Sequence, residues 1–399
     1  MDPQLNPYTP GSGLRPLEMS GRQQEIDSFD LLIARTTLGR QNRSLMLTGL
    51  RGVGKTVLLN ALWSQAERAE WFSIFLEGTP GELGARNIRE KLSRELLAAS
   101  RKLLRRPLSS QLRDALGSVS SFSTGFGVSG VDFKIDPQPG RADTGTLDID
   151  LEEMVEDLCS ALKETQSAFV LFIDELQEVD EELLSALLTV QHRAGQREWP
   201  FYLVGAGLPN LPARLATARS FAERLFEYHH IGPLEPEAAA QALRKPAQVV
   251  GGEFSPAALN HLVTASNGYP YFIQTFGKNI WHAAPQKRFT EEDARLAVEL
   301  GWRELDAGFF PARWDRATPS ERTYLSAMAS FSDHHISSTA VTERLGRTPK
   351  ALSPVRASLI HKGLIYAPEQ GVVAFTVPGM PEFIMRQEQI FGEPPSGTP

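Results

Sequence analysis

Short apolar runs alternate with amphipathic stretches through the first 234 residues of the chain. The runs are bounded by polar or glycine-rich segments, as strands are, and apolar residues recur at helical spacing between them. Such an alternation predicts an α/β domain with a doubly wound parallel sheet. The predicted strands are the one that opens residues 44–62 and those at 71–78, 168–173, 201–207 and 226–234.

The pattern becomes helical after residue 234. Residues 235–306 are predicted to form a helical unit, in which Ser255 and Pro256 begin one helix as N-cap and first-turn proline. Thr290 and Asp293 fit a capping box at the start of another helix.

The last part of the chain has a third pattern, beginning at Thr318. Helices are predicted at 320–331, 338–346 and 348–365, followed by a β-hairpin at 366–378. Pro354 is expected to limit where the regular part of the third helix can begin. Three helices and a hairpin predict a winged helix.

The hexapeptide GFGVSG at 125–130 fits the dinucleotide-binding pattern G-x-G-x-x-G, but its setting is wrong. No strand precedes it, and Pro137 and Pro139 stop any helix after it. Alternating apolar residues instead predict a β-hairpin over 122–135. The hairpin lies in an insert at about residues 106–150, which we expect either to pack against its own domain or to contact a neighbouring subunit, DNA or a partner.

Composition narrows the class of protein. The 399 residues are 41% hydrophobic and 22% charged, as in a folded protein of two or three domains. The net charge of −7 argues against a surface that is basic overall, so nucleic-acid binding would need a local patch. The single cysteine, Cys159, is expected to be a buried thiol. We find no signal peptide and no apolar run long enough to span a bilayer, so we expect a cytoplasmic protein with no membrane partner.

Residues 49–56, GLRGVGKT, fit G-x-x-x-x-G-K-S/T, the phosphate-binding loop or P-loop. Its glycines let backbone N–H groups turn toward phosphate oxygens, and the following helix directs its positive end at the same place. Lys55 is expected to reach the β- and γ-phosphates of ATP, and the Thr56 hydroxyl to bind Mg²⁺. The residues predicted to surround the nucleotide here are Gly49, Arg51, Gly52, Val53, Gly54, Lys55, Thr56 and Val57.

An acidic pair, Asp174 and Glu175, follows the predicted strand at 168–173. Asp174 is expected to hold the water shell of the Mg²⁺ ion, and Glu175 to orient and activate the attacking water. Both this pair and the P-loop fall at the carboxyl ends of parallel strands, where ligands bind in such sheets. The sequence therefore predicts an ATPase.

The chain resembles the AAA+ and STAND group of P-loop ATPases, in the branch close to origin initiators and to bacterial ATPases with a C-terminal winged helix. The resemblance rests on the P-loop, on LFIDELQ, on MSGRQQEIDSF at 19–29, and on SNGYPYFIQTFGKNIW at 266–281, whose G-x-P matches the lid motif of STAND proteins. It implies that Arg22 lies near the nucleotide and that Pro270 packs against the base or ribose. Pro270 also fits a plain helix stop and restart.

The resemblance covers nearly the whole chain and implies its domain organisation. The expected parts are an ATPase domain at 1–234, a helical lid at 235–310, a winged helix at 311–390 and a tail at 391–399.

Two departures from the family pattern concern hydrolysis. The strand at 201–207 runs into GAGLPN, without the polar residue that many AAA+ proteins use there to position water. Asn210 is the nearest polar residue, or serves only as a helix cap. The lid has Pro270 where many AAA+ proteins carry an arginine. These departures imply slow hydrolysis and a nucleotide-dependent switch.

Arginines at 214, 219 and 224 precede the last predicted strand. In AAA+ rings an arginine near this position reaches the neighbouring subunit's nucleotide. Arg224 matches that position best and Arg219 second, which implies a nucleotide-dependent homo-oligomer. The alternative is an exposed arginine paired with Glu223 or Glu227.

Basic residues gather between residues 341 and 366, where Glu343 is the only acidic residue. A basic winged helix suits duplex DNA. The predicted contacts are Arg344, Arg347, Lys350, Arg356 and Lys362. Three functions follow: a switch of initiator or loader type on DNA, a STAND-like signalling ATPase whose winged helix binds a partner protein, and a nucleotide-binding regulator without turnover.

Overall fold

The structure is a computed structural model that describes residues 1–391 except 12, 80, 106–108, 126–136 and 139. It contains two compact units. The sheet unit comprises Arg22–Gly49 and Lys55–Ile231, and the helical unit comprises Met1–Gly21, Leu50–Gly54 and Gly232–Pro399.

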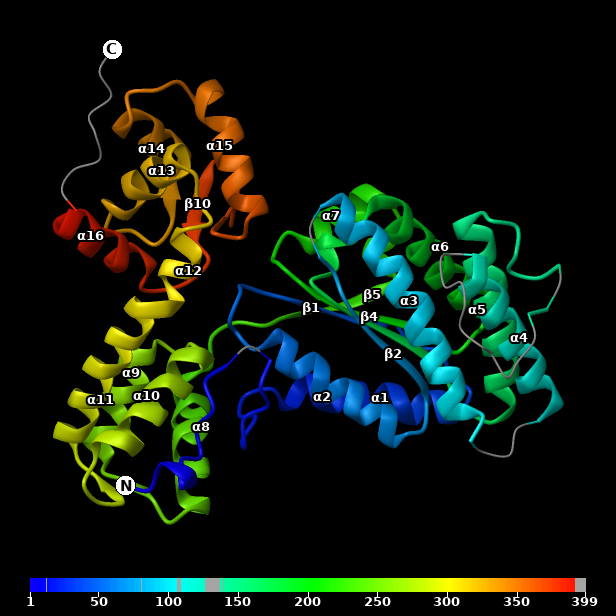
Figure 1. Cartoon of the computed structure of the whole chain (residues 1–399), viewed down its shortest axis with the longest axis horizontal. Coiled ribbons are helices and arrows are strands. Elements are labelled where there is room, and N and C mark those ends of the chain that lie inside the picture. The colour runs from blue at the N-terminus through cyan, green and yellow to red at the C-terminus, as the bar shows by residue number, and fades with distance from the viewer. Residues whose placement is uncertain (12, 80, 106–108, 126–136, 139, 392–399) are drawn as a thin grey trace. The chain divides into compact units, whose positions relative to one another are not determined.

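Five parallel strands form the centre of the sheet unit, in the order β2-β3-β4-β1-β5 (Figure 1). They are β1 (Ser44–Thr48), β2 (Phe72–Glu77), β3 (Phe169–Asp174), β4 (Phe201–Gly207) and β5 (Phe226–His230). Strands β1, β3 and β4 are buried along their whole length, as in parallel sheets covered on both faces. The predicted doubly wound parallel sheet is therefore confirmed.

Helices cover both faces of this sheet (Figure 1). On one side lie α1 (Gln23–Thr37) and α2 (Lys55–Arg68), and on the other α3 (Glu82–Leu103), α5 (Leu147–Glu164) and α6 (Glu181–Arg197). Alternate strand residues face opposite layers. Phe172 of β3 contacts Phe29 of α1, with ring centroids 5.8 Å apart, whereas Leu171 and Ile173 belong to the apolar cluster of α3, α5 and α6. Cys159 is buried in that cluster, as predicted.

Short elements complete the sheet unit near the ends of β3 and β4. The 3-10 turn η2 (Leu176–Glu178) follows β3, and α7 (Leu211–Ala218) follows β4. A second 3-10 turn, η3 (Ala222–Arg224), precedes β5.

The region between α3 and α5 corrects one prediction. Residues Ser110–Gly125 form a helix, α4, in which Phe122 is buried, so Phe122 does not begin a β-hairpin. The remaining predicted hairpin residues, 126–135, lie outside the described part of the chain. Helical spacing explains the difference, because Leu112, Leu116 and Val119 are buried with Phe122 on one face. The intervening serines are small enough to be buried as well.

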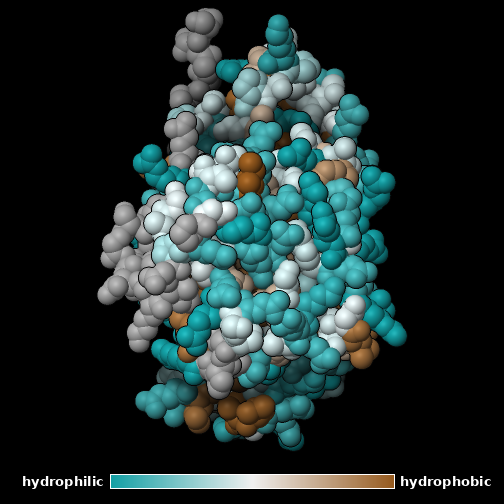
Figure 2. Space-filling model, turned by 90° about the vertical axis from the view of Figure 1, so that its right-hand side faces the viewer, coloured by the Kyte–Doolittle hydropathy of each residue, from teal (hydrophilic) through white to brown (hydrophobic). Residues whose placement is uncertain are grey.

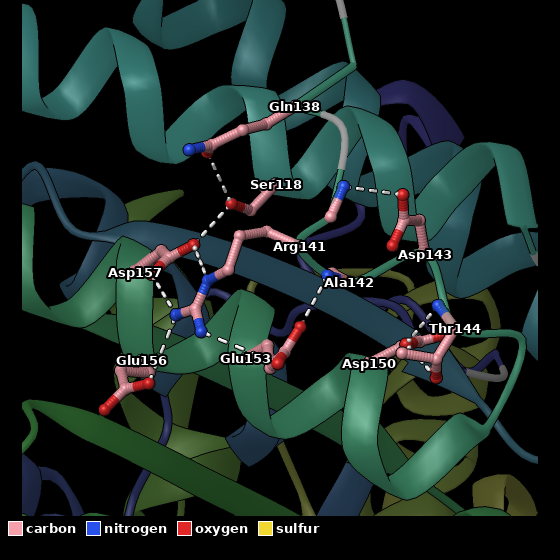
Figure 3. A network of polar contacts seen from close by, with 11 residues as sticks. Ser118, Gln138, Arg141, Ala142, Asp143, Thr144, Asp150, Glu153, Glu156 and Asp157 are labelled. Carbon is pink, nitrogen blue, oxygen red and sulfur yellow. Dashed lines mark hydrogen bonds and ion pairs between the residues drawn. The ribbon is translucent and has the colours of Figure 1, made fainter.

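Polar contacts fasten the end of the insert to α5 (Figure 3). Arg141 donates hydrogen bonds to the carboxylates of Asp157 and Glu156, and Asp157 also accepts from Ser118 of α4. The N–H groups of Thr144 and Gly145 each donate to Asp150 over 2.9 Å. The described part of the insert therefore packs against its own unit.

The helical unit begins with a bundle. Its elements are the 3-10 turn η1 (Pro3–Leu5), α8 (Pro236–Val249), β6 (Glu253–Phe254), α9 (Pro256–Ser266), α10 (Pro270–Ala283), β7 (Arg288–Phe289) and α11 (Glu291–Glu304). The Ser255 side chain accepts a hydrogen bond from the N–H of Ala258, and Thr290 and Asp293 form a reciprocal capping box. Both predicted helix starts are confirmed.

The C-terminal elements follow a π-helical turn, η4 (Leu305–Phe309). They are α12 (Pro311–Trp314), α13 (Pro319–Ala329), β8 (Ile336–Ser337), α14 (Ser338–Arg344), α15 (Pro349–His361), β9 (Ile365–Tyr366), β10 (Val372–Phe375) and α16 (Met380–Phe391). Strand β10 pairs antiparallel with β9, which confirms the predicted hairpin, and also with β8.

Pro354 corrects a second prediction, because it lies inside α15 and does not delay the start of that helix. Thr348 caps the helix by accepting a hydrogen bond from the N–H of Ala351, and Pro349 occupies the first helical position. At Pro354 the helix loses one backbone hydrogen bond. The favourable start at Thr348 and Pro349 offsets that loss.

One face of the molecule is mostly hydrophilic, with hydrophobic residues in small separate groups (Figure 2). Single exposed apolar side chains of this kind are normal for a folded protein. Among the described residues, no helix is both long and apolar enough to cross a membrane.

Candidate nucleotide-binding and hydrolysis site

The predicted P-loop connects β1 directly to α2. Gly52 and Gly54 have φ values of +83° and +95°, a region that residues with side chains rarely adopt. Helix α2 begins at Lys55, so its positive N-terminal end lies next to the loop. The strand, glycine turn and helix that phosphate binding needs are all present.

Two predicted ligand positions meet at the carboxyl end of the sheet. The hydroxyl of Thr56, in the first turn of α2, donates to Oδ2 of Asp174 at the end of β3 over 2.6 Å. Nζ of Lys55 donates to the carbonyl of Gly49 over 2.9 Å, and this lysine is only 5% exposed. Burial raises the pKa of Asp174, and the hydrogen bonds from Thr56 and from the N–H of Glu175 counteract that rise. Folding thus brings together Lys55, Thr56 and Asp174, as the sequence led us to expect.

Glu175 has an unusual backbone. Its φ and ψ of 47° and 45° are left-handed, which costs about 1–2 kcal/mol in a residue with a side chain. Neighbouring contacts maintain this conformation: the N–H of Glu175 donates to Asp174 Oδ1, and its carbonyl accepts from the N–H of Glu178. Gly78 lies so close that a Cβ there would be 2.4 Å from the Glu175 carbonyl oxygen. Backbone strain of this kind is common where a side chain must be aimed.

The carboxyl end of β4 lies between the P-loop strand and the Asp174 strand. The Gly207 carbonyl accepts from the N–H of Gly49 over 3.1 Å. On the other side, Oε1 of Gln177 accepts from the N–H of Leu208 over 3.1 Å, and its amide nitrogen donates to the carboxylate of Glu175. Gln177 was not among the predicted site residues, although it lies only two residues after Glu175 in the sequence. Asn210 is the N-cap residue of α7, but its side chain makes no capping hydrogen bond.

Arg22 lies immediately before α1 and is half-buried. Burial lowers its pKa, and nearby Glu25 raises it. Glu25 also lies 3.7 Å from Nδ1 of His229, on β5. The proximity of these two side chains lowers the pKa of Glu25 and raises that of His229. Neither Glu25 nor His229 was predicted as a neighbour of Arg22.

The three arginines before β5 differ in their surroundings. Arg214 donates to the carbonyl of Val179 over 2.7 Å, which ties α7 to the segment after Glu175. Arg219 and Arg224 are exposed, and within the described part of the chain neither has a carboxylate at ion-pair distance. The alternative in which Glu223 or Glu227 pairs with Arg224 is therefore absent from this structure.

Other predicted nucleotide neighbours belong to the helical unit. Val53 is buried, and a Cβ on Gly52 would lie 2.5 Å from the hydroxyl oxygen of Tyr269. Asn267 ends α9 with a φ of 47°, and Pro270 is the first residue of α10. The helix stop and restart is confirmed, and contact between Pro270 and a nucleotide stays a prediction.

The basic residues of the C-terminal region do not form one exposed patch. Arg344, Arg347 and Lys350 are exposed around the turn between α14 and α15, whereas Arg356 is half-buried. Lys362 needs a correction, since its Nζ donates to Glu321 over 2.6 Å and to the carbonyl of Arg316 over 2.9 Å. Its charge is therefore paired inside the fold.

These features define a P-loop nucleoside triphosphatase. Residues 18–204 match the family model described as an AAA ATPase domain. Residues 307–384 match a second model, described as a domain of unknown function. No curated protein matches the chain.

Several solved structures are similar to this chain. A Walker-type ATPase of Pyrococcus abyssi is 14% identical, covers 96% of this chain and 99% of its own, and has a TM-score of 0.59. Cdc6p from Pyrobaculum aerophilum is 15% identical over 98% of both chains, with a TM-score of 0.46. The Aeropyrum pernix Orc1 protein, solved in complex with DNA, is 14% identical over 94% of both chains, with a TM-score of 0.44. At 14% identity, the likeness to the Pyrococcus abyssi ATPase concerns the fold alone.

Proposed function

We propose that this protein is a nucleotide-dependent switch that binds ATP with Mg²⁺ and hydrolyses it slowly. The observation that carries the proposal is the hydrogen bond between Thr56 and Asp174, which joins two motifs 118 residues apart. A hydroxyl and a carboxylate are oxygen ligands of the kind that Mg²⁺ prefers, and such sites obtain their remaining ligands from phosphates and water. The residues present therefore fit the ion.

In this proposal each side chain has a distinct task. Lys55 exchanges the Gly49 carbonyl for β- and γ-phosphate oxygens, and its burial strengthens that attraction. Glu175 accepts a proton from the water whose oxygen attacks the γ-phosphorus, while the bond to the bridging oxygen breaks and ADP leaves. Bound Mg²⁺ supplies positive charge that neutralises the phosphate oxygens. Arg22 and Pro270 are proposed to line the nucleotide.

Slow turnover and assembly are proposed from two further observations. Strand β4 ends at Gly207 and therefore offers no polar side chain of its own to the attacking water. Arg224 is exposed on η3, as an arginine that serves a neighbouring subunit must be. We propose that it stabilises the transition state in trans within a nucleotide-dependent homo-oligomer.

Two substitutions test the ATPase. Lys55→Ala is expected to abolish ATP binding, and unchanged affinity would refute the assigned site. Glu175→Gln is expected to bind ATP normally but to lose about 10²–10⁴-fold in turnover, the usual contribution of a general base. Normal ATP binding without measurable turnover in the wild-type protein, and a Glu175→Gln variant that behaves like it, would instead favour a nucleotide-binding regulator without turnover.

The C-terminal region is proposed to be a winged helix, at about residues 311–390, that binds duplex DNA. Support comes from the order of three helices and a three-stranded sheet, and from the exposed Arg344, Arg347 and Lys350. Duplex DNA affinity should fall steeply with salt. Replacing all three residues by alanine should flatten that dependence, because each phosphate contact contributes about one unit of slope.

One observation favours a protein partner instead. Lys362 is paired inside the fold and Arg356 is half-buried, so fewer basic residues face solvent than the sequence indicates. A signalling ATPase of STAND type would then use this region for docking. A single stable partner recovered by pull-down, together with salt-independent or absent DNA binding, would support the hypothesis of a protein partner.

A further inference from the structure

We propose that Gln177 is the positioning residue for Glu175 and replaces the polar side chain that β4 lacks. The inference rests on the proposed function, in which Glu175 activates the attacking water. It concerns how that carboxylate is held, and it assigns a role to a residue outside the P-loop and the acidic pair.

The orientation of the Gln177 amide is fixed by its surroundings. Gln177 is 7% exposed, and its Oε1 accepts from the backbone N–H of Leu208 over 3.1 Å. A backbone N–H can only donate, so the oxygen of the amide must face β4. The NH₂ group then points the other way, and it donates to the carboxylate of Glu175.

The end of β4 is shaped to receive this amide. Position 207 is a glycine, and a Cβ there would lie 2.6 Å from Gln177 Oε1, closer than real contacts allow. A polar β4 side chain and the Gln177 amide therefore compete for the same space. In this chain Gly207 leaves the space open, and Gln177 enters it from the segment after β3.

The arrangement also links Glu175 to the P-loop. Gly207 accepts from Gly49, the first glycine of the loop, while the next residue, Leu208, donates to Gln177. The backbone of Glu175 is left-handed and follows directly from β3. The Gly207 carbonyl and the Leu208 N–H, at the end of β4, thus relate the position of the Glu175 carboxylate to that of Gly49. A misplacement of about 1 Å in such a site can reduce turnover by about 100-fold.

The test measures kcat and KM for ATP with Mg²⁺ in the full-length protein. Gln177→Leu should lower kcat about 10–100-fold and leave KM within about twofold, because it removes an interaction with the general base Glu175 and none with bound ATP. Gln191→Leu is the matched control. Gln191 is equally buried and accepts from the N–H of Leu203 on the same strand, but it has no contact with Glu175. Its kcat should stay within about twofold of wild type.

Gln177→Glu separates positioning from folding. The new side chain keeps an oxygen for the N–H of Leu208 but places a second carboxylate in contact with Glu175. Two carboxylates in direct contact do not both ionise. The acid limb of the kcat profile should therefore move to higher pH, a change that loss of folding alone would not produce. Gly207→Ala should displace the amide and lower kcat, and it should add little further loss to Gln177→Leu.

The outcomes distinguish this inference from the proposed function. Wild-type kcat and an unshifted pH profile in the Gln177 variants, beside an inactive Glu175→Gln protein, would overturn the role of Gln177 alone. Wild-type turnover in Glu175→Gln would overturn the proposed function itself.

Discussion

The pair formed by Glu321 and Lys362 allows one prediction to be worked out in numbers. Burial raises the pKa of Glu321, but hydrogen bonds from Lys362, Ser358 and Thr318 outweigh burial and lower that pKa from its ordinary 4.5 to about 2. Each unit of pKa difference corresponds to about 1.4 kcal/mol, so the shift corresponds to about 3 kcal/mol. Because the Lys362 side chain is 26% exposed, solvent screening reduces the expected contribution to about 2 kcal/mol.

The sign of the pH dependence follows from the lowered pKa. A carboxyl group with a depressed folded-state pKa contributes stability fully above its unfolded pKa, and loses it as the pH falls through the folded value. Glu321→Gln should therefore destabilise the region around α13 by about 2 kcal/mol at pH 7. The difference from wild type should shrink as the pH falls from about 5 to about 2.

Hydrogen–deuterium exchange of the full-length protein measures this effect locally, since it reports the free energy of opening of individual helices. Glu299→Gln is the matched control, because Glu299 forms an exposed ion pair with Arg303 that should contribute less than about 0.5 kcal/mol. The reasoning fails if the α13 amides of Glu321→Gln exchange no faster at pH 7 than those of the control. In that case Lys362 would also return to the candidate DNA-binding residues.

Three further predictions concern Gly54, His229 and Arg224. Gly54→Ala should weaken ATP binding at least tenfold. Gly39→Ala is the control, because Gly39 also has a positive φ and a Cβ there would meet no atom within 4 Å; it should lower the free energy of unfolding by a similar amount, about 1 kcal/mol, without affecting ATP binding. Equal ATP affinities in the two variants would count against the P-loop geometry. The raised pKa of His229 means that its pairing with Glu25 stabilises the protein fully below pH 6.5, and that this stabilisation weakens as the pH rises through the folded-state pKa. The thermal unfolding temperatures of wild type and His229→Asn, measured between pH 5 and 9, should therefore converge at high pH. Arg224→Ala should reduce turnover only under conditions where wild-type activity rises with protein concentration, and a concentration-independent loss would argue against action in trans.

The sequence alone determined the sheet, the P-loop and the acidic pair. Each is encoded in one contiguous stretch, because a strand, a glycine turn and a helix start have local requirements. Parallel topology then places Asp174 and Thr56 at the same sheet edge. Local patterns were less decisive where two periods competed. Alternating apolar residues favoured a strand at Phe122, whereas the helical spacing back to Leu112 prevailed in the folded protein.

Only the tertiary structure decided which polar side chains are partners. The sequence placed Lys362 in a basic patch, whereas in the structure its charge is paired with Glu321, 41 residues away. Gln177 is an ordinary polar residue in the sequence, whereas in the structure its amide lies beside Gly207 at the end of β4 and accepts a hydrogen bond from Leu208. The physical reason is the same in both cases. The effect of a charge or an amide depends on its burial and on its neighbours in space, and chain spacing does not specify those neighbours.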